Sequence, residues 1–154
     1  ALAVLIPFPA IAVGGSPVLV CPKSKVLAEV FGRNNHVFAL PDQAALRSFI
    51  AVQALLSPVA KLLEDATTWT ASRTGDKDEA ERFLRILIGG AICAQPFEQP
   101  GALLALLNDL NTKGGLNAEL REYFAENGAN DVLRRGLDRL EQRLMPDVDA
   151  AKDA

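Results

Sequence analysis

The feature that most constrains this chain is a long, strongly apolar helical pattern that runs from Asp42 to about Ser72. Apolar residues recur at helical spacing along two adjacent stripes, so only a narrow face remains for polar side chains. A helix that is apolar over so much of its circumference has to be covered on more than one side. In a chain of 154 residues, we expect a second copy of the chain to supply the missing cover. Pro58 lies inside the pattern and is expected to kink the helix or to split it in two.

The residues before Pro41 have the pattern of a small α/β unit. Aliphatic runs at 2–6, 17–21 and 36–40 predict three strands, and the first run is typical of a strand buried on both faces in a parallel sheet. Residues 24–32 predict a short helix that ends at a glycine. Three short strands cannot close a core alone, so we expect the trailing part of a larger α/β sheet.

The first twenty or so residues are apolar, but prolines and a Gly-Gly pair interrupt them and no basic segment precedes them. This pattern argues against a signal peptide or a membrane segment. The chain begins at Ala1 on a predicted strand, without an initiator Met, and we interpret it as part of a longer protein.

After the long helix, the pattern predicts further helices only. Asp76 or Asp78 is expected to cap the first of them, and Gly128 is expected to end the third. Gly89 and Gly90 lie inside the first of these helices, where each glycine lowers the stability of the helix by about 1 kcal/mol relative to Ala. Because a glycine has no Cβ, we expect another backbone to approach closely there and to compensate for this loss. The predicted ranges are about 76–94, 101–110, 117–127 and 130–144.

Composition and charge narrow the possible partners. The net charge is −3 and the basic residues are scattered, which argues against a nucleic acid or an anionic membrane. With one His, no Cys-x-x-Cys and no His-Glu-x-x-His, no metal site is predicted. Cys21 and Cys93 stand in apolar settings far apart in the sequence, and we interpret them as two buried thiols rather than a disulfide.

One stretch, Thr112 to Asn117, has a physical reason to hold a ligand. Gly114-Gly115 precede a predicted helix, where backbone N–H groups and the positive end of the helix dipole favour a carboxylate or phosphate. Thr112 and Asn117 could add polar contacts. A Gly-Gly pair before a helix is also typical of a plain tight turn, so both interpretations stay open at this point.

The order of these motifs resembles the C-terminal portion of the pyrroline-5-carboxylate reductases and their NAD(P)-dependent relatives. Residues 111–117, which read Asn-Thr-Lys-Gly-Gly-Leu-Asn, stand where that family has a Thr-Ser-Pro-Gly-Gly-Thr-Thr-like motif. Ile6-Pro7-Phe8-Pro9 and Gly14-Gly15 are similar to the family's Met-Pro-Asn-x-Pro-type exit from its Rossmann domain. The similarity spans nearly the whole chain.

The resemblance implies an α/β fragment followed by an all-α region. Residues 1–41 would be the last strands of a Rossmann-type, NAD(P)-binding sheet. Residues 42–145 would form a helical dimerisation and substrate domain of the 6-phosphogluconate-dehydrogenase C-terminal-like type, and 146–154 a flexible tail. The helices would build an intertwined homodimer or a larger oligomer, in a cytoplasmic enzyme of proline biosynthesis.

The resemblance also implies a chemistry. NADP or NAD would deliver hydride to a C=N or C=O bond of a small carboxylate substrate, with Pro7 and Phe8 touching the cofactor. No catalytic residue is assigned. The implied substrate-binding residues are Thr112, Gly114, Gly115, Leu116 and Asn117.

The chain departs from the family pattern at several positions. Leu116 and Asn117 replace the two family threonines, and Lys113 replaces the Pro. The family's Gly-Ser-Gly-Pro-Ala-Tyr-like helix start is absent, and residues 48–53 stand in that region. These changes remove hydroxyls that would orient a substrate and protonate its nitrogen. A relative that acts on another imine or carbonyl, or a paralogue with little activity, is therefore an alternative.

No Gly-x-Gly-x-x-Gly motif occurs in the chain, so the turn that binds pyrophosphate is not among these residues. We expect the cofactor to be held mainly by residues outside this chain, and these residues alone to be inactive and to bind NADPH weakly. Two alternatives stay open. One is a non-catalytic helical dimerisation module. The other is a ketopantoate-reductase-like, 6-phosphogluconate-dehydrogenase-like or deazaflavin-dependent member of the same superfamily.

Other conspicuous residues have plainer interpretations. His36 is expected on the surface of a strand, and Trp69 in the core or at an interface. Ser48 and Gln53 could face a substrate, but ordinary polar positions on a helix explain them equally well. Glu79 and Glu81 are expected to be first-turn helix acids rather than an acid–base pair.

Overall fold

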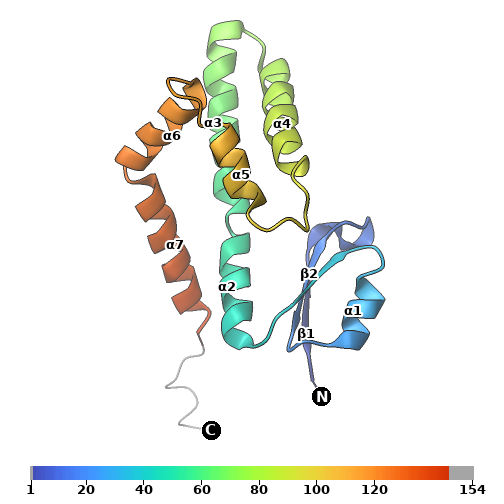
Figure 1. Cartoon of the computed structure of the whole chain (residues 1–154). Coiled ribbons are helices and arrows are strands. Elements are labelled where there is room, and N and C mark those ends of the chain that lie inside the picture. The colour runs from blue at the N-terminus through green and yellow to red at the C-terminus, as the bar shows by residue number, and fades with distance from the viewer. Residues whose placement is uncertain (1, 146–154) are drawn as a thin grey trace. The chain divides into compact units, whose positions relative to one another are not determined.

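The structure, a computed structural model, describes residues 2–145 and divides into two compact units. The first unit comprises residues 2–53 and 136–145, and the second comprises residues 54–135. The strands lie in the first unit, whereas the second unit is built of helices (Figure 1). The predicted tail, residues 146–154, lies outside the described residues.

A three-stranded sheet organises the first unit. Its order is β1 (Val4–Pro7), β2 (Pro17–Cys21) and β3 (His36–Ala39). β1 runs antiparallel to β2, with Ile6 opposite Leu19, whereas β2 and β3 run parallel. Between β2 and β3 the helix α1 (Lys25–Phe31) provides the crossover that a parallel pair requires. The predicted strand, strand, helix, strand order is therefore confirmed.

The prediction for the first strand was wrong in one respect. β1 pairs with β2 in the antiparallel direction, and its residues are exposed or half-buried rather than buried on both faces. Residues 8–16, which include a short 3-10 helix η1 (Pro9–Ala12), connect the two strands. Such a link is shorter than the dozen or more residues that a parallel crossover needs, so the chain reverses direction instead.

The core of the first unit lies on β2, which has a neighbouring strand on each side. Every residue from Val18 to Cys21 is buried. Leu46 and Ile50 of α2 (Gln43–Gln53) pack against this strand, and Figure 1 shows α1 and α2 on opposite sides of the sheet. The remaining members of this cluster are Leu19, Cys21, Leu40, Ile6, Phe8 and Ala45.

The long helical pattern forms two helices rather than one. α2 ends at Gln53, and α3 (Leu56–Thr74) begins just before Pro58, which occupies its first turn. A proline ring clashes with the carbonyl four residues before it, here that of Ala54, but fits the first turn of a new helix. Pro58 was expected either to kink the helix or to split it in two, and the structure confirms the split.

α3 and α4 (Lys77–Cys93) form a hairpin in the second unit. Gly75 ends α3 in the left-handed conformation, with φ 81°. The Asp76 carboxylate then accepts a hydrogen bond of 2.9 Å from the Glu79 amide and caps α4. Of the two predicted caps, Asp76 and Asp78, it is therefore Asp76 that caps α4. Thr67 of α3 and Ala80 of α4 are buried.

Three more helices follow within residues 2–145. α5 (Ala102–Asp109) leads through a turn into α6 (Leu116–Glu126), and Gly128, with φ 77°, follows the end of α6 as predicted. α7 (Ala129–Arg143) starts in the second unit, and its later residues belong to the first. Within the first unit, Ser48 of α2 donates a hydrogen bond of 2.6 Å to Glu141 of α7.

The helices of the second unit bury almost none of their apolar side chains. Between residues 54 and 135, the buried residues are Thr67, Ala80 and Ala118. Large apolar side chains on these helices stay exposed, among them Leu62, Trp69, Phe83, Ile86, Leu87, Ile92, Leu103, Leu104, Leu120 and Phe124. An apolar surface of this extent indicates a contact with something outside the unit.

By length and composition alone, Gln43–Thr74 would be long and apolar enough to cross a membrane. The stretch free of charged residues is shorter, because it runs from Ser48 to Ala60 between Arg47 and Lys61. At a helical rise of about 1.5 Å per residue, this stretch would be roughly 20 Å long. The hydrocarbon core of a lipid bilayer is about 30 Å thick, so the stretch is too short to span it without a charged residue. The expectation that the protein has no membrane partner stays a prediction.

Candidate functional site

The Gly-Gly stretch forms a tight turn between α5 and α6. The Gly115 amide donates to the Thr112 carbonyl at 2.8 Å, which closes the turn. Gly114 has φ 73°, a left-handed value that suits glycine. Gly115 is needed for a different reason, since a Cβ on it would lie 2.9 Å from the Thr112 carbonyl oxygen. The two glycines thus meet two separate requirements of one turn.

The turn delivers the N-terminus of α6 to the surface. The Glu119 amide makes the first helical hydrogen bond, to Gly115 at 3.1 Å, so the amides of residues 116–118 have no partner within the helix. Within the described part of the chain, no side chain caps α6. These backbone donors and the positive end of the helix dipole provide an anion-binding geometry.

The structure brings the five predicted substrate residues together in this turn and the first turn of α6. Thr112 and Asn117 are exposed, so their polar groups can reach a ligand. Leu116 is 84% exposed and presents an apolar side chain beside the amides. Whether these residues bind a substrate stays a prediction.

Arg121, which lies one turn into α6, was not predicted as part of the site. One of its guanidinium nitrogens donates to the Leu107 carbonyl of α5 at 3.1 Å, and the other donates to Asn111 Oδ1 at 2.5 Å. Asn111 immediately precedes the turn. A signal was available in the sequence, because the free carbonyls at the end of α5 need a donor and a following helix can supply one.

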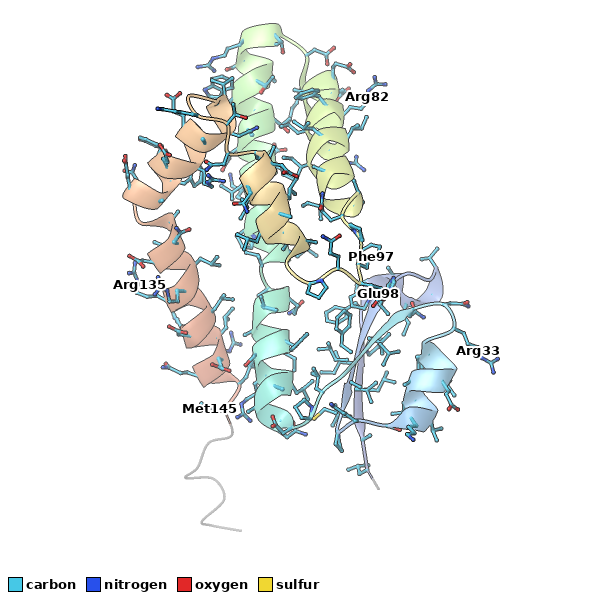
Figure 2. All side chains as sticks on the ribbon, in the orientation of Figure 1. Arg33, Arg82, Phe97, Glu98, Arg135 and Met145 are labelled. Atoms are coloured by element: carbon cyan, nitrogen blue, oxygen red, sulfur yellow. The ribbon has the colours of Figure 1, made fainter. Side chains whose placement is uncertain are left out.

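Two surface hollows lie elsewhere in the second unit. One, of about 260 Å³, lies between α3 and α4, and the other, of about 530 Å³, lies along α4. Neither includes the Gly-Gly turn. The first is lined by Ala60, Leu63, Glu64, Thr67, Glu81, Leu84 and Arg85, and the second by Asp78, Glu81, Arg82, Arg85 and Ile86. Figure 2 shows Arg82 directed away from α3.

The predicted cofactor residues lie at the end of β1. Pro7 is exposed, whereas Phe8 packs against the core cluster of the first unit. The nearby Gly14-Gly15 pair faces Asn34 rather than an open cradle. The Gly15 amide donates to the Asn34 carbonyl at 2.6 Å, and a Cβ on Gly14 would lie 3.1 Å from the same oxygen. These residues do not form a pyrophosphate site by themselves.

The remaining candidates have structural settings of their own. His36 is exposed, and its backbone amide pairs with Ser16, as expected of a surface strand residue. Glu79 and Glu81 pair with Arg82 at 3.2 Å and with Arg85 at 3.3 Å on the surface of α4. Both are charges on the surface of α4, but only Glu79 lies in its first turn, so the prediction of first-turn acids is confirmed for Glu79 and wrong for Glu81.

Ser48 and Gln53 are exposed residues of α2, and the Ser48 hydroxyl is engaged by Glu141. Trp69 is 60% exposed, with the Arg73 guanidinium 3.8 Å from its ring centroid. The prediction of a core position for Trp69 was therefore wrong within one chain, and an interface position stays a prediction.

The expectation of two buried thiols was wrong in part, and the expectation of a close backbone approach at Gly89-Gly90 stays a prediction for a second copy. Cys21 is buried as expected, but Cys93, the last residue of α4, is exposed, and both thiols are free. No atom of the described chain comes within 4 Å of a Cβ built on Gly89 or Gly90, beyond the local backbone of α4. The close backbone approach expected there does not occur within one copy.

Among residues 2–145, no group of three or more acidic, His or Cys side chains could hold a metal ion.

Comparison with known proteins finds no matching protein-family model and no matching curated protein. Among solved structures, the chain is similar to the NADP-bound pyrroline carboxylate reductase of Plasmodium falciparum, with a TM-score of 0.72 and 12% identity. The match covers 92% of this chain and 58% of the other, so this chain spans less than two thirds of that protein. At this identity the likeness shows the fold, a small sheet followed by helices as in the C-terminal part of that reductase.

Proposed function

We propose that this chain is part of an NAD(P)H-dependent oxidoreductase that reduces a C=N or C=O bond of a small carboxylate substrate. The observation that carries the proposal is one fold match that runs through both the strands and the helices, over 92% of the chain. The matched protein is a pyrroline carboxylate reductase with NADP bound. A substrate of the pyrroline-5-carboxylate type is therefore the first to test.

In this proposal the substrate carboxylate binds at the N-terminus of α6. The amides of residues 116–118 lack helical partners and can each donate to an anion. Thr112 and Asn117 are exposed beside them. Because the dipole of the helix adds partial positive charge at this end, a carboxylate binds there more favourably than a neutral group does. The turn would thus select the charge of the substrate and hold it in place.

The cofactor would be held mainly by residues that this chain does not contain, since no Gly-x-Gly-x-x-Gly occurs in it. When bound, a nicotinamide cofactor supplies the hydride. Pro7 is exposed at the end of β1 and could contact the cofactor there. Phe8 packs against the core cluster, so it would act mainly by fixing the position of Pro7.

The same proposal includes a homodimer. The second unit buries only three of its residues and leaves Trp69, Phe83 and Ile86 exposed among many other apolar side chains. A second copy would cover this surface, and Gly89-Gly90 would let its backbone approach α4, because nothing in the described chain occupies that space. Light scattering tests this part. We expect a dimer at micromolar concentration, and a well-folded monomer would refute it.

The test of the activity is an assay of the complete protein, with all of its residues, for NADPH oxidation in the presence of pyrroline-5-carboxylate. We expect turnover with a carboxylate substrate and none with an analogue in which the carboxylate is an amide. Cofactor binding without turnover of this substrate would favour another imine or carbonyl compound. Failure to bind either nicotinamide cofactor would overturn the proposal.

A non-catalytic dimerisation module is the second candidate. The observation that favours it is Leu116, which is 84% exposed at the mouth of the turn and has no hydroxyl to offer a substrate. This candidate predicts a stable dimer that neither binds NADPH nor responds to carboxylates. Titration of the complete protein with NADPH therefore separates the two candidates.

A further inference from the structure

We propose that Arg121 is the positioning residue of the Gly-Gly turn, which it holds in the orientation needed to present the α6 amides to a carboxylate. The inference rests on the proposed function, because it gives those amides their role. Arg121 is not itself assigned a contact with the substrate.

The turn is fixed internally but only weakly held to its surroundings. Its own hydrogen bond, from Gly115 to Thr112, sets its shape. Residues 112–114 are all exposed, so packing does little to set its direction. Ala118, in the first turn of α6, is buried and anchors that turn by packing, so a further contact that joins α6 to α5 would fix the direction of the turn together with it.

Arg121 supplies that link from a half-buried position. Its two hydrogen bonds reach the last turn of α5, at Leu107, and the residue just before the turn, Asn111. The Asn111 amide is also bonded, to the Asn108 carbonyl at 3.0 Å, so Asn111 is fixed at both its backbone and its side chain. One guanidinium thus joins the segments on both sides of the turn.

The chemistry of the side chain suits this role. A guanidinium presents several donors in a rigid plane, whereas a lysine ammonium is a point charge on a flexible stem. The substitution Arg121→Lys could therefore satisfy one of the two acceptors but could not hold both in the same geometry. The positive charge also lies at the C-terminal end of α5, where the helix dipole favours it.

The first test is hydrogen exchange without any ligand. In Arg121→Ala we expect the amides of Gly115 and Glu119, both of which are hydrogen-bonded, to exchange about tenfold faster. The reason is that the free energy of a hydrogen bond from a charged donor corresponds to at least a tenfold change in the opening equilibrium of the turn. The matched control is Arg82→Ala, because Arg82 pairs only locally with Glu79 on the exposed surface of α4. Unchanged exchange in Arg121→Ala would overturn the proposal.

The second test separates positioning from folding. In the complete protein, Arg121→Ala should raise the KM for the carboxylate substrate about tenfold, while kcat and the KM for NADPH change by less than about twofold. Asn111→Asp keeps the acceptor oxygen and should retain the normal KM, whereas Asn111→Leu should raise it and should not add to Arg121→Ala. Faster exchange with an unchanged substrate KM would overturn the positioning role.

The two proposals fail in different ways. If the unmodified protein has no turnover but Arg121→Ala still speeds exchange at Gly115 and Glu119, the proposed function is wrong and the structural role of Arg121 stands. If the unmodified protein is active and Arg121→Ala lowers only kcat, Arg121 acts on the chemical step and the positioning role is wrong.

Discussion

Lys77 Nζ lies 2.7 Å from Glu64 Oε1 and so joins the first turn of α4 to the middle of α3. The hydrogen bond from Lys77, followed by its charge, lowers the pKa of Glu64 below its ordinary value of 4.5. The same pair raises the pKa of Lys77 above 10.5. Both side chains are about half exposed, so water screens the interaction and its effect on stability is small.

This pair predicts a pH dependence whose sign follows from linkage. Because the pKa of Glu64 is lowered in the folded state, its contribution is present above 4.5 and is lost as the pH falls through the lowered pKa. Because the pKa of Lys77 is raised, its contribution is lost only as the pH rises past 10.5. We expect Glu64→Gln to lower the unfolding midpoint slightly near neutral pH.

The difference in unfolding midpoint between Glu64→Gln and the unmodified protein should therefore shrink in acid. Thermal unfolding followed by circular dichroism, at pH values on either side of 4.5, measures this difference. Asp65→Asn is the control, because Asp65 pairs with Lys61 along α3 and does not join the two helices. A difference that grows as the pH falls would contradict the prediction.

The two glycines of the turn should respond differently to alanine. Gly114→Ala meets no atom within 4 Å, so its cost is the left-handed backbone strain of about 1 kcal/mol. Gly115→Ala places its Cβ 2.9 Å from the Thr112 carbonyl oxygen and has to displace the turn itself. We expect Gly115→Ala to reduce substrate binding more than Gly114→Ala does.

Urea unfolding and substrate titration on the two variants check this order. Gly114→Asn is a useful third variant, since Asn tolerates the left-handed region better than Ala. Equal loss of substrate binding in Gly114→Ala and Gly115→Ala would show that the geometry of the turn does not control the site.

Gly89→Ala distinguishes a lone chain from the proposed dimer. In a single copy the substitution meets no atom within 4 Å and removes a helix-interior glycine, so it should stabilise α4 by about 1 kcal/mol. In the proposed dimer, a Cβ there would hold the partner's backbone away. We expect the dissociation constant of the dimer to rise about tenfold, as analytical ultracentrifugation would measure. Greater stability with unchanged self-association would argue against a partner at this position.

Trp69 offers a direct optical test, because it is the only tryptophan in the chain. It is 60% exposed in one copy and stacks with Arg73. If a second copy covers it, its fluorescence emission should shift to shorter wavelength as the protein concentration rises through the dissociation constant. Arg73→Ala controls for quenching by the stacked guanidinium. An emission maximum that does not depend on concentration would place Trp69 outside any interface.

Much of the fold could be predicted because local rules determine it. Pro58 ends one helix and starts another, Asp76 caps α4, and Gly128 follows α6, each for a reason that lies within a few residues. The antiparallel pairing of β1 with β2 was harder, because the direction of a strand depends on the path of the link rather than on its own sequence.

The candidate site was predictable only in its backbone. Gly114 and Gly115 signal a turn before a helix, and the structure has one there. The contacts of Arg121 were not predictable from periodicity, since they join side chains and carbonyls that are ten or more residues apart. The exposure of Cys93 was missed because an apolar sequence around a residue does not show whether another element covers it.

The chain passes between its two units twice, near residue 54 in α2–α3 and near residue 135 within α7. Truncation at either end therefore affects the units unequally. A fragment of residues 54–135 keeps one unit whole, whereas a fragment that stops at residue 53 loses Glu141, the hydrogen-bond partner of Ser48. To isolate the strand-bearing unit, a protein engineer would have to excise residues 54–135 and join the part of α7 from residue 136 onward to the end of α2.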